Sequence, residues 1–216
     1  MDTTIKKQPE PKPKAAPQEK PDASDVPAKF TNSVKNLLDE YYEIRDLEEA
    51  KECVLELKAN DAMYTEFVHS VLTSVRKEPR IPLAAKLLVF LRKVSLLTNS
   101  HLEGGFKRCF DTVGDDSEEF PNLPKFYGKL FGQLVKEGSM NLSFLSEIHS
   151  QDSKMIILRF NGAALDTNFE GKEEVDIVSA LKEAGFSSES LTRKEKPDRL
   201  PRYFSVSFYP VFFEKH

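Results

Sequence analysis

The chain has 216 residues and a mass of 24.6 kDa, which is enough for one good-sized domain and flanking tails. Its net charge of −4 argues against a dedicated nucleic-acid-binding domain, which is normally basic. Two cysteines are too few for a disulfide framework, and the N-terminal residues lack the apolar segment of a secretory signal. The longest purely apolar run, Leu87–Leu91, is far shorter than the ~20 residues of a membrane helix. We therefore expect a cytoplasmic protein without membrane association.

Residues 1–28 form a distinct N-terminal segment. It contains six of the 13 prolines, and Ile5 and Val26 are its only branched aliphatic residues. Such a segment cannot bury enough apolar surface to offset the entropy lost on ordering. We predict a disordered tail. Two accessory roles stay open for it: a proline-motif ligand, and a weak, salt-sensitive RNA contact through Lys6, Lys7, Lys12 and Lys14.

From residue 31 onward, apolar residues recur at helical spacing. A first helix is expected to begin near Thr31, and the capping-box spacing of Asp46 and Glu49 predicts the start of a second. A third helix ends before Pro79, and Pro82 is suited to the first position of a fourth. The predicted inward faces comprise Val34, Leu37, Leu38 and Tyr41, then Ala50, Cys53, Val54 and Leu57, then Tyr64, Phe67, Val68, Val71, Leu72 and Val75, then Ala84, Leu87, Leu88 and Leu91.

Two further helices follow. Ser100 and Glu103 have capping-box spacing and predict the start of a fifth helix, in which Gly104-Gly105 permits close helix packing. After an acidic loop, the most apolar stripe of the chain predicts a sixth helix, with Gly138 suited to close it in the left-handed conformation. The sixth stripe comprises Leu123, Phe126, Tyr127, Leu130, Phe131, Leu134 and Val135.

The connections between these helices are short, so consecutive helices are expected to pack as antiparallel neighbours. The prediction is an all-α fold, an α-solenoid of antiparallel helical hairpins of the HEAT kind. Weaker helical patterns at Leu142–His149, Met155–Leu165 and Val175–Ala184 predict two more hairpins and extend the domain over residues 29–196. Residues 197–216 are rich in aromatic side chains, match no helical template and form a separate C-terminal tail.

The sequence contains little that indicates catalysis. No phosphate-binding glycine motif is present, and neither cysteine lies in a CxxC motif, so we interpret both as small buried hydrophobic residues. The histidines form no i,i+4 pair, and we predict surface or helix-capping roles rather than metal ligation. We expect no catalytic residue, metal or cofactor. The residues considered are Cys53, Cys109, His69, His101, His149 and His216.

One charge pattern is unusual. Five carboxylates and no basic residue lie between Asp111 and Glu119, directly before Phe120-Pro121-Asn122. They fit a solvated loop whose charges favour the N-terminus of the next helix. They also fit a hydrolase with paired carboxylates, although the chain has no Trp for sugar binding. A third interpretation is an interface that presents carboxylates to an arginine-rich partner.

Three segments together resemble the MA-3 domain family. They are LLDEYYEIRDLEEAKECVLEL (37–57), LLTNSHLEGGFKRCFDTV (96–113) and GDDSEEFPNLPKFYGKLFGQLVKEG (114–138). The last contains the family's pattern of an acid, three residues, an acid, one residue and a proline, here Asp115, Glu119 and Pro121. Glu119 replaces the usual Asp and keeps its charge. The resemblance covers roughly residues 30–195 and extends to the domains of eukaryotic translation initiation factor 4 gamma and of programmed cell death protein 4, with the C-terminal part more similar to the former.

This resemblance implies a non-enzymatic, monomeric adaptor in translation initiation that binds the DEAD-box RNA helicase initiation factor 4A through the acidic loop. The motif implies Asp115, Glu119 and Pro121 as partner-binding residues, and local charge density adds Asp116 and Glu118. Two alternatives stay open at this point. One is a HEAT-like scaffold with another partner, and the other is a competitive inhibitor of helicase–scaffold assembly.

Overall fold

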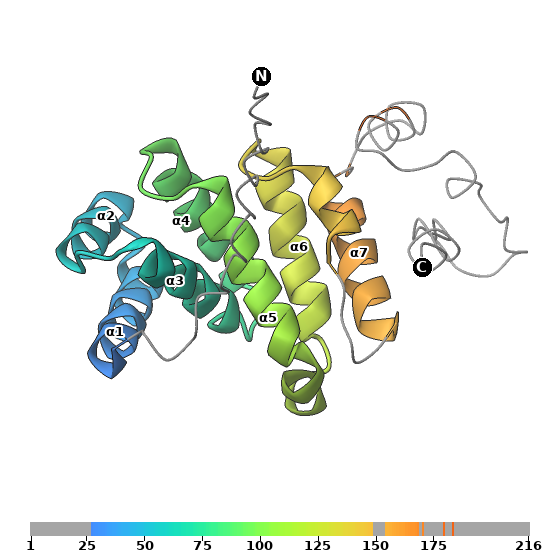
Figure 1. Cartoon of the computed structure of the whole chain (residues 1–216), viewed down its shortest axis with the longest axis horizontal. Helices are drawn as coiled ribbons and strands as arrows, with labels where there is room; N and C mark the ends of the chain where they lie inside the picture. Colours follow the sequence, from blue (N-terminus) through green and yellow to red (C-terminus); the bar gives the residue numbers. More distant parts are fainter. Residues whose placement is uncertain (1–26, 149–153, 169, 171–178, 180–182, 184–216) are drawn as a thin grey trace, which may run out of the picture.

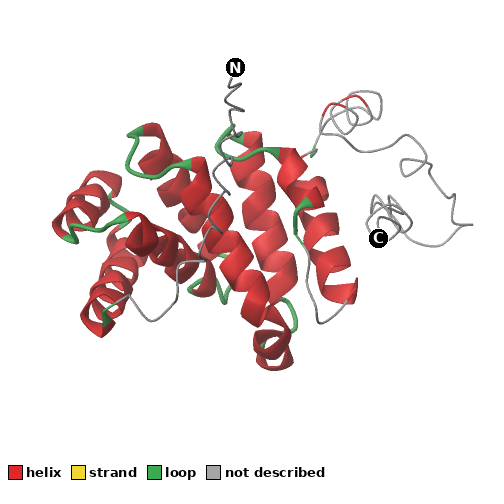
Figure 2. Ribbon diagram, viewed as in Figure 1, coloured by secondary structure: helices red, strands yellow, loops and turns green. Residues whose placement is uncertain are grey.

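The structure is a computed structural model that describes residues 27–148, 154–168, 170, 179 and 183 (Figure 1). Within these residues it is built from helices, without a strand (Figure 2), as the sequence predicted. The elements are α1 (Ala28–Ile44), α2 (Leu47–Glu56), α3 (Asp61–Thr73), α4 (Arg80–Lys93), α5 (Asn99–Glu119), α6 (Leu123–Lys136), the 3₁₀ helix η2 (Leu142–Ser146) and α7 (Lys154–Asn168). The C-terminal tail (197–216), nearly all of the segment predicted helical at 175–184, and all but the last two residues of the N-terminal tail lie outside the described residues.

The helices stack as hairpins in two layers. In one layer α3 lies between α1 and α5, and in the other α4 lies between α2 and α6, as Figure 1 shows. Within the third hairpin, Phe106 of α5 contacts Phe131 of α6, and Cys109 lies beside Tyr127, so the two helices run antiparallel. This arrangement confirms the predicted HEAT-like α-solenoid.

A fourth hairpin is present in reduced form. Its first helix is η2 rather than the longer helix predicted over Leu142–His149, and it lies beside α5, where the ring of Phe144 is 6.3 Å from that of Phe106. Its second helix, α7, packs along α6. Since η2 occupies the first layer and α7 the second, the alternation of the solenoid continues through residue 168.

Several helices begin earlier than predicted. α1 begins at Ala28, directly after Pro27, so its first turn includes the buried Phe30. α4 begins at Arg80, which makes Pro82 its third residue rather than its first. A proline is tolerated at both positions, because the N–H groups of the first turn have no partner within the helix.

The start of α5 corrects the predicted capping box at Ser100 and Glu103. The N-cap is Thr98, whose hydroxyl accepts the His101 N–H at 3.3 Å, while the Thr98 N–H donates to His101 Nδ1 at 3.2 Å. The acceptor role of Nδ1 leaves the proton on Nε2, 3.3 Å from Asp61 Oδ1. His101 therefore has a capping role, as predicted for the histidines in general, in a box that normally uses Glu or Gln.

Two glycines of α6 allow α7 to approach closely. A Cβ atom at Gly128 would lie 2.2 Å from the carbonyl oxygen of Phe160, and one at Gly132 would lie 2.4 Å from that of Ala164. The contacts advance in the same direction along both helices, so α6 and α7 run parallel. Gly138, with φ of 69°, follows α6 in the left-handed conformation, as predicted.

The Gly128→Ala substitution should reduce the free energy of unfolding by about 1–3 kcal/mol, because the added methyl group forces two packed backbones apart. Gly162→Ala in α7 is the matched control, since a Cβ there meets nothing within 4 Å. That control should stabilise the protein by up to about 1 kcal/mol through helix propensity. Urea unfolding followed by circular dichroism measures both, and equal effects would contradict the α6–α7 contact.

Candidate protein-interaction site

The acidic residues predicted to form a loop belong to the last turns of α5. The helix has 21 residues and continues to Glu119, and the Phe120 N–H still donates to the Asp116 carbonyl at 2.9 Å. The reason is packing: Phe110 and Val113 are buried on the same helix face, and Ser117 continues that face. The helical spacing of the residues that face the core therefore continues through the acidic run. Packing of this face stabilises the helix more than the like charges destabilise it.

We call the five carboxylates, Asp111, Asp115, Asp116, Glu118 and Glu119, the acidic cluster. Four of them are exposed, and Asp116 is half-buried and accepts a hydrogen bond from the Thr112 hydroxyl at 3.2 Å. Among the described residues, no lysine, arginine or histidine lies within 4 Å of any of these carboxylates. Four carboxylates of the cluster therefore face solvent, and no basic side chain of the described residues forms an ion pair with them.

The position of the acidic cluster opposes the stability of its own helix. The last turn of a helix carries partial negative charge from its free carbonyl groups, and the last turn of α5 contains no basic residue. Asp115 and Glu119 are also four residues apart on one helix face, where like charges repel. The carboxylates thus lie at the C-terminal end of α5, where negative charge destabilises the helix. One interpretation of the sequence had instead placed them in a loop before α6, whose positive N-terminus they would stabilise.

Two arginines from other elements hold the turn after the cluster. The Arg76 guanidinium, in the α3–α4 connection, lies 4.4 Å from the centre of the Phe120 ring, which favours a cation–π contact. Arg159 of α7 donates through Nη1 to the Pro121 carbonyl at 3.2 Å. Pro121 itself is exposed. These two contacts could not be predicted from the sequence, because each arginine lies more than 35 residues from its partner.

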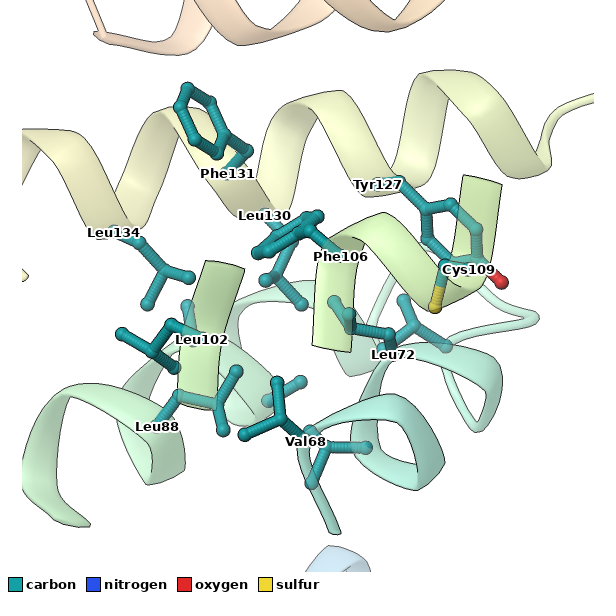
Figure 3. Close-up of a cluster of buried hydrophobic side chains, with 14 of the residues drawn as sticks. Val68, Leu72, Leu88, Leu102, Phe106, Cys109, Tyr127, Leu130, Phe131 and Leu134 are labelled. Atoms are coloured by element: carbon teal, nitrogen blue, oxygen red, sulfur yellow. The ribbon is translucent and has the colours of Figure 1, made fainter. Parts of the chain in front are cut away.

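The core beneath the cluster is unsuited to nucleophilic chemistry. Cys109 is buried beside Tyr127 (Figure 3), and burial raises the pKa of its thiol well above the ordinary value. Burial, followed by the neighbouring Cys109, also raises the pKa of the Tyr127 hydroxyl. Cys109 is thus the buried hydrophobic residue that was predicted, whereas Cys53 is only partly buried.

A buried carboxylate of α3, Glu66, forms an ion pair with Arg108 of α5, one turn before the cluster. Glu66 is 8% exposed, and its carboxylate lies 2.7 Å from Arg108 Nη1 and 3.4 Å from His69 Nδ1. Burial tends to raise the pKa of Glu66, but the hydrogen bond and charge of His69, together with the charge of Arg108, lower it overall.

The described part of the chain holds no group of three or more His, Cys, Asp or Glu residues with metal-binding geometry. It also has no helix long and apolar enough to cross a membrane.

These features define a HEAT-like helical-repeat domain that presents a cluster of carboxylates at the end of its third hairpin. The MA3 domain family model matches residues 30–141, which include the whole acidic cluster and Pro121. The chain therefore belongs to the MA3 domain family, as its resemblance predicted. The MA3 domain is a helical protein-interaction fold.

Two relatives are similar to part of this chain. The chain is 27% identical over 140 residues to a von Willebrand factor A domain-containing protein of Dictyostelium discoideum, covering 62% of this chain and 7% of that protein. It is 25% identical over 120 residues to a eukaryotic translation initiation factor 4G of Cucumis melo, covering 54% of this chain and 6% of that protein. The chain thus spans only a small part of the length of either relative.

Neutralising the cluster should stabilise the domain. In the Asp115→Asn/Glu119→Gln variant, removal of the repulsion between the two acids and of their unfavourable interaction with the helix end should add roughly 0.5–2 kcal/mol at low salt. The increase should shrink at high salt because these groups are exposed. Thermal unfolding at two salt concentrations measures it, and a lower melting temperature would mean that these carboxylates have stabilising partners.

Proposed function

We propose that this chain is a non-enzymatic adaptor of cytoplasmic translation initiation that binds the DEAD-box RNA helicase initiation factor 4A through the acidic cluster. The main observation behind this proposal is the set of four exposed carboxylates, Asp111, Asp115, Glu118 and Glu119, which form no ion pair with any described residue and lie at a helix end held by Arg76 and Arg159. Membership of the MA3 family and similarity to an initiation factor 4G support a translation setting.

The geometry suits a basic protein surface. Carboxylates form short, charge-assisted hydrogen bonds with arginine, often through both oxygen atoms. Asp115 and Glu119 share a face of α5, so one basic groove or helix on the partner reaches both. Because α5 and the turn at Phe120 are already ordered by packing, binding costs little additional backbone entropy.

The predicted site residues have different roles in this proposal. Asp115 and Glu119 make the direct ionic contacts, and Glu118 adds long-range attraction from the exposed rim. Asp116 is half-buried and hydrogen-bonded within α5, so it contributes mainly to the local negative potential. Pro121 is exposed in the anchored turn and offers an apolar contact next to the charges.

Charge reversal tests the interface. The Asp115→Lys/Glu119→Lys variant should lose at least about 100-fold in affinity for the helicase, because two attractive contacts become repulsive. The fold should be retained, since both side chains are exposed and lysine is favourable near a helix C-terminus. Calorimetry or surface plasmon resonance with purified helicase measures the loss, and circular dichroism checks the fold.

The chain offers a matched control in α1. Asp39 and Glu43 are also exposed acids four residues apart, so Asp39→Lys/Glu43→Lys makes the same change in charge at another place. This control should bind the helicase with nearly wild-type affinity. Equal losses in the two variants would show that only net charge matters, and unchanged binding by the folded Asp115→Lys/Glu119→Lys variant would disprove the interface.

A further inference from the structure

A groove of about 610 Å³ lies on the face formed by the second layer, away from the acidic cluster. Its apolar lining comes mainly from α4, through Pro82, Ala85, Val89 and Phe90, and Leu47 at the start of α2 extends it. Such a surface favours an occupant with large apolar side chains.

The charges around the groove nearly cancel. Lys93 lies 3.4 Å from Glu137, and Lys136 lies 3.9 Å from Glu170, which leaves Lys86 as the lining residue without an ion pair within the described part of the chain. A highly charged occupant would gain little from such a lining. An uncharged aromatic occupant fits better, because lysines at the rim also interact favourably with aromatic ring faces.

The chain itself supplies an occupant of this kind. The groove lining includes Thr167 and Glu170, which are among the last described residues, so the chain continues from the edge of the groove. Residues 203–213, YFSVSFYPVFF, follow 32 residues beyond Glu170 and contain six aromatic and no charged residues. We propose that residues 203–213 bind in this groove of the same molecule and cover it.

The length of the connection is compatible with this contact. The 32 residues between Glu170 and Tyr203 provide enough length, because even a fully helical connection, at about 1.5 Å per residue, would extend about 48 Å. Attachment through this connection makes the binding intramolecular and raises the effective concentration of the segment at the groove. Even a weak intrinsic affinity therefore keeps the groove occupied. This contact uses none of the residues of the acidic cluster. Its test is therefore independent of the test of helicase binding.

A single tryptophan reports on the contact. The chain has no Trp, so Phe208→Trp places one fluorophore in the segment and keeps it aromatic. In the full chain its emission should be shifted to shorter wavelength and protected from acrylamide, relative to a peptide of residues 197–216 with the same substitution. Both properties should be unchanged on tenfold dilution.

A charged groove should release the segment. Pro82→Glu/Lys86→Glu changes two exposed lining residues, and an acid in the first turn of α4 is favourable for the helix. The matched control, Lys35→Glu/Asn36→Glu on the exposed face of α1, changes net charge by the same amount. Only the groove variant should lose the emission shift and the acrylamide protection.

Three results would overturn the proposal: emission of the full chain like that of the free peptide, a shift that survives in the groove variant, or a shift that depends on concentration and so reports a second copy. A photo-crosslinking residue at position 208 provides a measurement that needs no groove variant. Its adducts should map to α4 or α6 within one chain, and adducts confined to other elements would contradict the contact.

Discussion

The close contact of α5 with α3 fixes the part of the molecule that carries the acidic cluster. A Cβ atom at Gly105 would lie 2.4 Å from Val68 Cγ1, so the absence of a side chain brings the two helices together. One residue later, the Phe106 ring lies 5.6 Å from that of Phe131 in α6 and 6.2 Å from that of Phe160 in α7. Three helices are thereby held around one turn of α5, as the cluster of buried side chains in Figure 3 shows in part. The turns that follow have little freedom to move.

The contacts of α5 with α3, α6 and α7 explain how the protein maintains an unfavourable arrangement of charge. The carboxylates after Asp111 repel one another and the carbonyl end of their helix, yet α5 continues to Glu119 because Val113 is fully buried in the core. Apolar burial of a single side chain contributes roughly 1.5–3 kcal/mol, which exceeds the cost of a few exposed like charges. A charge arrangement that opposes stability and is held by surrounding packing is typical of a binding site.

The sequence predicted the fold well because each apolar stripe repeats at helical spacing over several turns. The buried faces of the helices from Val34 to Leu134 agree with these stripes. It predicted helix ends less well, since the capping pair Thr98 and His101 lies outside the usual residue pattern. The acidic run was wrongly assigned to a loop because its composition was weighed above the period set by Phe110 and Val113. Asp115, Glu119 and Pro121 are exposed, whereas their role as partner-binding residues and the identity of the partner stay predictions. The supporting arginines follow only from the tertiary fold.

The role proposed for the acidic cluster requires that it belong to a rigid helix end rather than to a loop. Native-state hydrogen exchange of the amides from Val113 to Phe120 tests it most directly, because their N–H groups are bonded within α5. Protection of these amides should be well above that of an unfolded chain, and it should decrease in an Arg76→Ala variant that removes the contact with Phe120. Exchange of these amides at unfolded-chain rates in the wild-type protein would contradict it.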